Sequence, residues 1–166
     1  MPRRSRQWRE ALVPGIAYID YYMAIEVREP RTQEELDLYY DLRWRVLREQ
    51  WTKARDSGRD EHEHDAFHLT AWDGSKLVGT GRLHFNTPEE AQVRCMAVED
   101  AYRSTGVGGL ILRALEQRAL ERGAKLIMLN AREGAVSFYR KHGFLLMDQS
   151  NTLFDLIPHW RMHKNL

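Results

Sequence analysis

The chain has 166 residues, of which 43% are hydrophobic and 30% charged, and its formal net charge is +1. This balance is typical of one globular domain, and the near-neutral charge excludes the strongly basic surface that nucleic-acid binding requires. No segment approaches the roughly 18 apolar residues that span a bilayer. Because Cys95 is the single cysteine, no internal disulfide can form, and we expect a cytoplasmic protein with neither nucleic acid nor membrane as partner.

The first expected strand, residues 24–28, follows an arginine-containing N-terminal segment. Pro14 and Gly15 interrupt the short apolar stretch of that segment, which does not fit a cleaved signal peptide. We therefore expect residues 1–22 to form an extension and residues 23–166 to form the domain.

A helix is predicted from Thr32, because Glu35 lies three residues further on at the spacing of a capping box. Its apolar stripe should face the core, while Arg43, Arg48 and Glu49 should face mostly solvent. The stripe consists of Leu36, Tyr39, Tyr40, Val46, Leu47 and Trp51. The charged segment that follows, residues 56–65, has no apolar anchor and should be an exposed loop.

Three strands are expected next, at residues 67–72, 76–85 and 93–98. Asp73-Gly74 is a tight-turn signal between the first two, and Pro88 lies in the turn before the third. The spacing predicts an antiparallel meander.

A glycine-containing loop, residues 103–108, opens directly into a predicted helix at residues 107–122, with Gly123 as its C-cap. Consecutive backbone N–H groups and the positive end of the helix dipole would favour a bound anion there. The segment therefore predicts a pyrophosphate cradle, with a merely flexible turn into a helix as the alternative.

Two other phosphate loops do not match this segment. A Walker loop needs lysine after its second glycine, but Leu110 follows Gly109. A dinucleotide fingerprint needs a third glycine where Ile111 stands. Nucleotide hydrolysis and NAD binding are therefore not expected.

The last third of the chain alternates strands and helices, with strands at residues 125–129, 144–147 and 152–157 and a helix at 135–142 that ends at Gly143. Asn130 follows four apolar residues, so we expect its amide to be buried and to need partners. The order of elements predicts a mixed α/β sheet with helices on both faces.

Two segments carry a family resemblance. Residues 103–108, RSTGVG, and 129–144, LNAREGAVSFYRKHGF, occur in an order and at a separation similar to the two cofactor motifs of the GNAT superfamily of acetyl-CoA-dependent N-acetyltransferases. The resemblance runs from Ala24 to the C-terminus and implies the GNAT fold, a mostly antiparallel mixed sheet with helices on both faces. Residues 96–98 and 158–164 most resemble the ElaA-type branch.

The resemblance implies direct transfer of an acetyl group from acetyl-CoA to a primary amine. Backbone groups of the strand at 96–98 would hold the pantetheine arm, with the Val98 N–H polarising the thioester oxygen. The implied cofactor-binding residues are Met96, Ala97, Val98, Arg103, Ser104, Thr105, Gly106, Val107, Gly108, Gly109, Asn130 and Ser137. Lys141 could also meet the phosphates, or it is solvated surface charge.

The resemblance places the general acid on Tyr139. A phenol with an ordinary pKa of about 10 stays protonated at neutral pH and can donate to a thiolate whose thiol has a pKa of about 8.5. Alternatively, Tyr139 is a core or rim aromatic residue. Asn130 would contact the cofactor arm or a bridging water, or would cap the next helix with Glu133.

An amine with a pKa of about 10.4 must lose a proton before attack. Glu99 is the first candidate base, because several family members use an acid near this position, and Asp65, His68 and His84 follow. Each of the four also fits a structural or solvent-facing role.

No metal is expected, because the histidines at 62, 64, 159 and 163 lack the Cys/His framework of a zinc site. Cys95 should be a small packing residue inside a strand, not an acyl-carrying nucleophile.

Two other functions stay open. One is a catalytically silent acetyl-CoA-binding sensor or assembly module of the same fold. The other is an interaction subunit without a cofactor, which the intact glycine loop disfavours. The acceptor is expected to be a small-molecule or peptide amine, and a homodimer is left open because dimers are common in the family.

Overall fold

The computed structural model describes residues 24–51, 53–153 and 157–166, except for the side chains of Trp51 and Leu153. The expected extension, residues 1–22, lies outside the described residues, so the division into extension and domain stays a prediction. Within the described ranges, no helix combines the length and the apolar character needed to cross a membrane.

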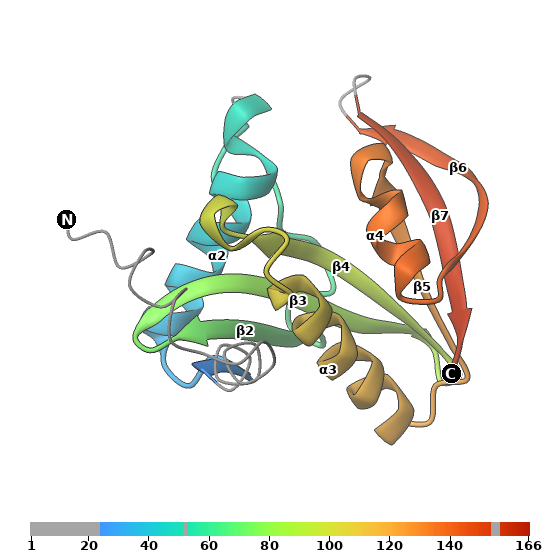
Figure 1. Ribbon diagram of the computed structural model, residues 1–166, viewed down its shortest axis with the longest axis horizontal. Helices are drawn as coiled ribbons and strands as arrows, with labels where there is room; N and C mark the ends of the chain where they lie inside the picture. The colour runs from blue at the N-terminus through green and yellow to red at the C-terminus, as the bar shows by residue number, and fades with distance from the viewer. Residues whose placement is uncertain (1–23, 52, 154–156) are drawn as a thin grey trace, which may run out of the picture.

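Seven strands form one sheet in the order β1-β2-β3-β4-β5-β7-β6 (Figure 1). They are β1 (Ile25–Arg28), β2 (Phe67–Asp73), β3 (Lys76–Thr87), β4 (Glu90–Val98), β5 (Leu126–Arg132), β6 (Leu145–Leu153) and β7 (Ile157–Asn165). Every neighbouring pair is antiparallel except β4 and β5, which are parallel. The predicted mostly antiparallel mixed sheet is thereby confirmed.

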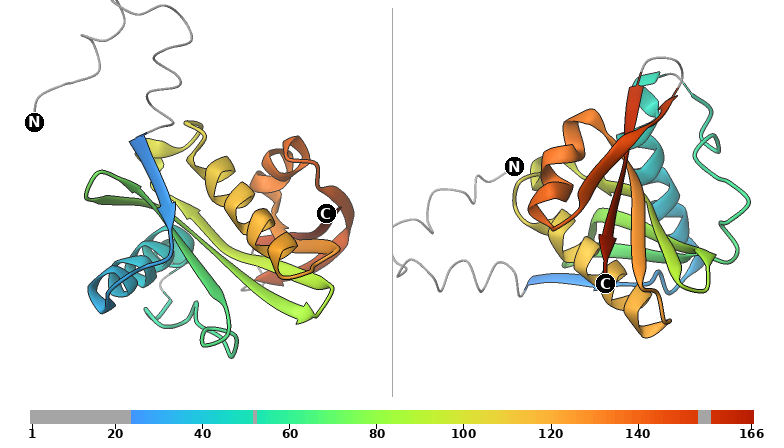
Figure 2. Two further views of the ribbon diagram at one scale, coloured as in Figure 1. Left: turned by 90° about the horizontal axis from the view of Figure 1, so that it is seen from below. Right: turned by 90° about the vertical axis from the view of Figure 1, so that its right-hand side faces the viewer.

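Helices cover both faces of this sheet (Figure 2). Helix α2 (Gln33–Leu47) lies on one face, and α3 (Val107–Glu121) with the short α4 (Val136–Lys141) lies on the other. Three short 3-10 turns flank these helices. Along the chain, η1 (Glu49–Trp51) follows α2, η2 (Asp100–Tyr102) precedes α3, and η3 (Glu133–Ala135) precedes α4. Thr32 caps α2 as predicted, because its hydroxyl accepts the Glu35 N–H at 3.2 Å.

Two glycines of β3 allow α3 to approach the sheet closely. A Cβ at Gly81 would lie 2.7 Å from Ile111 Cγ2 and 2.9 Å from Met96 Sδ, and a Cβ at Gly79 would lie 2.8 Å from Ile111 Cδ1. Since real Cβ atoms do not tolerate such distances, glycine is needed for this packing. The close contact fixes the N-terminus of α3 beside the end of β4.

The sheet opens between β4 and β5. These strands pair only from Glu90 with Leu126 to Val93 with Leu129. Beyond that point the register of β3 and β4 shifts, and Cys95 adopts a left-handed backbone conformation with φ 56°. This bulge bends β4 away from β5, and the two strands diverge toward their C-terminal ends (Figure 1).

The predicted solvent-facing side of α2 is wrong for Arg43, which is only 4% exposed. Its guanidinium forms an ion pair with Glu63 at 3.0 Å, and Arg82 of β3, with no exposed surface, forms ion pairs with Asp60 and Glu63. The segment 56–65 is therefore not a uniformly exposed loop. Two buried cations require carboxylate partners, and this segment supplies them.

The C-terminal strands also differ from the expectation. The sequence predicted strands at residues 144–147 and 152–157. In the structure, one strand, β6, runs from Leu145 to Leu153, and β7 begins at Ile157 and runs to Asn165. Residues 154–156 of the second expected strand lie outside the described residues. Much of β6 is solvent-exposed, so its residues alternate only weakly between apolar and polar, and periodicity underestimates its length.

Candidate active site

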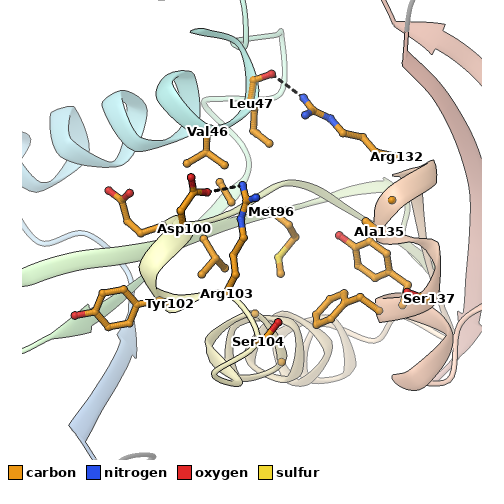
Figure 3. Close-up of a pocket in the computed structure, with 18 of the residues that line it drawn as sticks. Val46, Leu47, Met96, Asp100, Tyr102, Arg103, Ser104, Arg132, Ala135 and Ser137 are labelled. Carbon is orange, nitrogen blue, oxygen red and sulfur yellow. Dashed lines mark hydrogen bonds and ion pairs between the residues drawn. The ribbon is translucent and has the colours of Figure 1, made fainter. Parts of the chain in front are cut away.

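A cleft of about 1510 Å³ occupies the opening between β4 and β5. Its walls come from the end of α2, the last residues of β4, the N-terminus of α3, and η3 with α4 (Figure 3). The divergence of two strands that are paired at one end creates this space. A long, narrow ligand can thus insert between the separated ends of these two strands.

The N-terminus of α3 forms one wall. Gly106 is the N-cap with φ 96°, and no side chain caps it. The first turn closes where the Leu110 N–H donates to the Gly106 carbonyl at 3.0 Å, so the N–H groups at the start of the helix lack acceptors within it. They and the helix dipole suit a diphosphate.

Glycine at positions 108 and 109 keeps this wall close to α4. A Cβ at Gly108 would lie 3.3 Å from Phe138 Cζ, and a Cβ at Gly109 would lie 2.9 Å from His142 Nε2. The lack of side chains at these two positions lets the first turn of α3 pack directly against Phe138 and His142.

The end of β4 forms the floor of the cleft, with Met96, Ala97 and Val98 among the lining residues. Glu99 donates its N–H to the Val78 carbonyl of β3 at 2.9 Å. Because N–H directions alternate along an antiparallel strand, the Val98 N–H points away from β3 and toward the opening. This backbone donor is well placed for a developing negative charge.

Tyr139 of α4 also lines the cleft and is 7% exposed. Burial raises the pKa of its phenol well above the ordinary value, and Cys95 adds to this effect. The rings of Phe138 and Phe144 contact it edge-on, at centroid distances of 5.0 and 5.8 Å. Tyr139 is therefore a protonated hydroxyl held in place by aromatic packing.

Of the candidate bases, the cleft contains Glu99 and none of the other three. Glu99 forms an ion pair with Arg45 of α2 at 2.8 Å. His68 instead contacts the Tyr39 hydroxyl at 3.0 Å and the Glu63 carbonyl at 2.8 Å, while His84 is buried beside Asn86.

The cleft brings together most of the residues that the sequence suggested for the cofactor. Those lining it are Met96, Ala97, Val98, Arg103, Ser104, Gly106, Gly108, Gly109 and Ser137. Thr105 lies outside this set, with its hydroxyl bound to the Tyr102 carbonyl, and Val107 is buried in the core.

Asn130 departs from its expected environment. It lies within β5, in register with Arg161, and is exposed, so the expectation of a buried amide is wrong. It is also not a helix cap, because Arg132 and Ala135 occupy the N-cap positions of η3 and α4. The extension of β5 to Arg132 moves Asn130 from the end of the strand to its interior.

Sequence reasoning missed Arg132, Phe138 and His142 as lining residues. The Arg132 Nη2 donates to the carbonyl of Leu47 at 2.6 Å, which joins the end of β5 to the end of α2 (Figure 3). A charged residue three positions after the apolar run that ends at Leu129 is the signal that could have identified Arg132.

Cys95 is not the regular strand residue that the sequence suggested. It occupies the bulge of β4, and its Sγ accepts a hydrogen bond from Arg43 Nη2 at 3.0 Å. His159 and His163 lie on strand β7, and among the residues with described positions no three or more His, Cys, Asp or Glu side chains are grouped as metal ligands.

Comparison with known proteins agrees with this architecture. Residues 26–144 match the model of the acetyltransferase (GNAT) family. A Bacillus subtilis (strain 168) protein named uncharacterized N-acetyltransferase YjcF is 33% identical over 135 residues, which cover 81% of this chain and 96% of that protein. The chain therefore belongs to the GNAT acetyltransferase family.

Solved structures share the fold. Escherichia coli ElaA has a TM-score of 0.71 at 21% identity, with 85% of this chain and 99% of ElaA covered. A GNAT family acetyltransferase from Elizabethkingia anophelis, solved with acetyl-CoA bound, has a TM-score of 0.67 at 15% identity, with 86% and 99% covered. The fold of this chain therefore resembles that of ElaA, and the finer placement in an ElaA-type branch stays a prediction.

Proposed function

We propose that this protein transfers an acetyl group from acetyl-CoA to a primary amine in one direct step. The observation that carries the proposal is the cleft itself, where the N-terminus of α3, the free backbone edge of β4 and the hydroxyl-bearing Tyr139 line one opening. The family membership and the acetyl-CoA bound in the Elizabethkingia anophelis protein support this choice of donor.

The cofactor would bind along the wall formed by α3 and β4. The loop at residues 103–108 and the N–H of Gly109 would grip the diphosphate, with Thr105 and Val107 contributing through their backbone. Met96, Ala97 and Val98 would pair with the amide groups of the pantetheine arm, and Ser137 would contact it from α4. Because Asn130 lies outside the cleft lining, its amide would act there only through a bridging water.

Acetyl-CoA would supply the reactive thioester, and three groups of this chain would assist its reaction. The Val98 N–H would stabilise negative charge on the carbonyl oxygen, and Tyr139 would donate its proton to the departing sulfur. Glu99 would accept the proton of the amine. It would do so either after turning away from Arg45 or while still paired with it. The lone Cys95 and this donor both suit a cytoplasmic site of action.

Two measurements test the proposal. Isothermal titration calorimetry with coenzyme A should detect one site per chain, and acetyl-CoA should release free thiol at a rate that depends on an added amine. Binding without amine-dependent release across a broad panel would favour the silent sensor or assembly module. Absence of binding at millimolar coenzyme A would contradict both functions.

A further inference from the structure

Arg132 differs from Arg28, Arg43 and Arg82, three other arginines that are buried or half-buried, because it has no carboxylate partner among the described residues. Arg28 pairs with Glu35, Arg43 with Glu63, and Arg82 with Asp60 and Glu63. Arg132 is half-buried and donates to the neutral carbonyl of Leu47, and among the described residues it forms no ion pair. Within the described ranges, no carboxylate therefore compensates its positive charge, although burial makes such compensation favourable.

Other cations surround this guanidinium. Burial lowers the pKa of Arg132, and the charges of Arg48 and Arg103 lower it further. His159, which faces Arg132 across the β5–β7 pair, has its pKa lowered first by burial and then by Arg132, Arg48 and Arg94. Positive charges converge on this end of the sheet, where they repel one another.

The carboxylates of the cleft do not relieve this repulsion. Glu99 is engaged by Arg45 at 2.8 Å, and Asp100 by Arg103 at 3.0 Å. Glu49 and Glu133 also line the cleft, but both are exposed to solvent, where water screens their charge. An anion that enters this end of the cleft would relieve the repulsion between these charges.

The position of Arg132 separates this anion from the diphosphate. Arg132 reaches from β5 toward Leu47 of α2, whereas Ser104 and the start of α3 lie on the opposite side of the cleft (Figure 3). Arg132 thus lies across the opening from Ser104 and the start of α3, although the Arg103 side chain reaches from the loop toward Asp100 and its charge acts on Arg132. An acceptor entering between α2 and β5 would meet it.

We propose that Arg132 binds an acidic group, a carboxylate or a phosphate, carried by the amine acceptor. The substrate is then an amine that also bears a negative charge, such as an amino acid or an aminoalkyl phosphate, and not a simple polyamine. After its bond to Leu47, the guanidinium retains further N–H groups for a bidentate contact with such an anion. This inference rests on the proposed acetyl transfer.

The test compares acceptors that differ only in their acidic group. Thiol release from acetyl-CoA is measured with glycine and glycinamide, with longer amino acids and their amides, and with phosphoethanolamine and ethanolamine. The acidic member of at least one pair should have a kcat/KM at least about tenfold higher. In Arg132→Gln this preference should fall by about 10- to 100-fold, while the rates of the neutral amines change little.

Controls separate charge from folding and cofactor binding. Arg132→Lys keeps the charge and should retain part of the preference, and Arg140→Gln removes an exposed charge from α4 outside the cleft and should retain all of it. Calorimetry of Arg132→Gln should give a Kd for coenzyme A within about threefold of the parent value. A much larger loss of coenzyme A affinity would show that Arg132 serves a cofactor phosphate and would overturn the inference.

Equal rates with acidic and neutral amines, or a preference that survives Arg132→Gln, would also overturn it while leaving acetyl transfer intact. If no amine is acetylated although coenzyme A binds, transfer itself has failed. Thermal denaturation of the coenzyme A complex then decides the inference, with N-acetyl amino acids and their amides as probes. The N-acetyl amino acids should raise the Tm of the parent protein more than their amides do, and should not raise the Tm of Arg132→Gln. If acids and amides shift the Tm of the parent protein equally, or if the acids shift both proteins equally, the inference is overturned.

Discussion

Tyr139 combines a proton that burial retains with a position on the wall of the cleft. Removing only its hydroxyl tests the proposed acid without disturbing the ring packing. In Tyr139→Phe, turnover should fall by about 10- to 1000-fold, because the thiolate departs unprotonated, while calorimetry should show little change in coenzyme A affinity. Phe138→Leu, a change to the neighbouring ring, serves as the comparison for packing effects. Unchanged turnover in Tyr139→Phe would remove the acid role.

Glu99 is the candidate base that the fold brings into the cleft. Glu99→Gln keeps the shape of the side chain but cannot accept a proton, so amine-dependent thiol release should fall by about 100-fold with unchanged coenzyme A binding. Asp41→Asn is the matched control, because Asp41 is the second carboxylate on Arg45, at 2.7 Å, and does not line the cleft. Equal losses in the two variants would indicate that Glu99 only positions Arg45.

At the scale of elements, the contact between β3 and α3 determines where the cofactor loop lies. Gly81→Ala would place a methyl group 2.7 Å from Ile111 Cγ2 and 2.9 Å from Met96 Sδ. Overpacking of this kind should lower the free energy of unfolding by about 1–3 kcal/mol, measured by urea denaturation. Gly134→Ala is the control, since its Cβ would meet nothing within 4 Å. Equal stability of the two variants would mean that α3 shifts without cost.

For the whole molecule, we predict loss of stability in acid, because the buried Arg82 depends on ion pairs with Asp60 and Glu63. Burial alone would raise the pKa of Asp60, but hydrogen bonding and charge from Arg82, with charge from Arg94, lower it from 3.8 to about 2. Because the folded-state pKa lies below the unfolded one, this stabilisation is complete well above pH 4 and is lost as the pH falls toward 2. The denaturation midpoint, measured at intervals from pH 7 to pH 2, should decline as the pH falls from about 4 toward 2.

Asp60→Asn should remove part of that decline. At pH 7 the variant should be less stable than the parent by about 1–3 kcal/mol, because Arg82 keeps Glu63 but loses one charged partner. Asp56→Asn, an exposed position in the same segment, should leave both the stability and its pH dependence unchanged. A parent-like acid transition in Asp60→Asn would show that the network does not control acid stability.

The elements of the fold were largely predictable, because they depend on local patterns. Thr32 and the apolar stripe marked α2, the Asp73-Gly74 turn marked the β2–β3 pair, and Gly106 marked the start of α3. The burial of Arg43 and Arg82 was not predictable, because their partners lie about 20 positions away along the chain, in a segment that looks solvated. The length of β6, an exposed edge strand, also escaped periodicity.

By itself, the sequence determined the family resemblance, the order of the elements and the loop that would hold a diphosphate. These features depend on side-chain spacing over a few residues and on the backbone freedom of glycine. Only the tertiary structure decided that Glu99 and Tyr139 line one cleft, that Asn130 is exposed, and that Arg132 has no counter-charge in the part of the chain that is described. Those properties depend on how β4 and β5 separate after Val93 and Leu129, and a divergence between strands more than 30 residues apart in the chain leaves no local pattern.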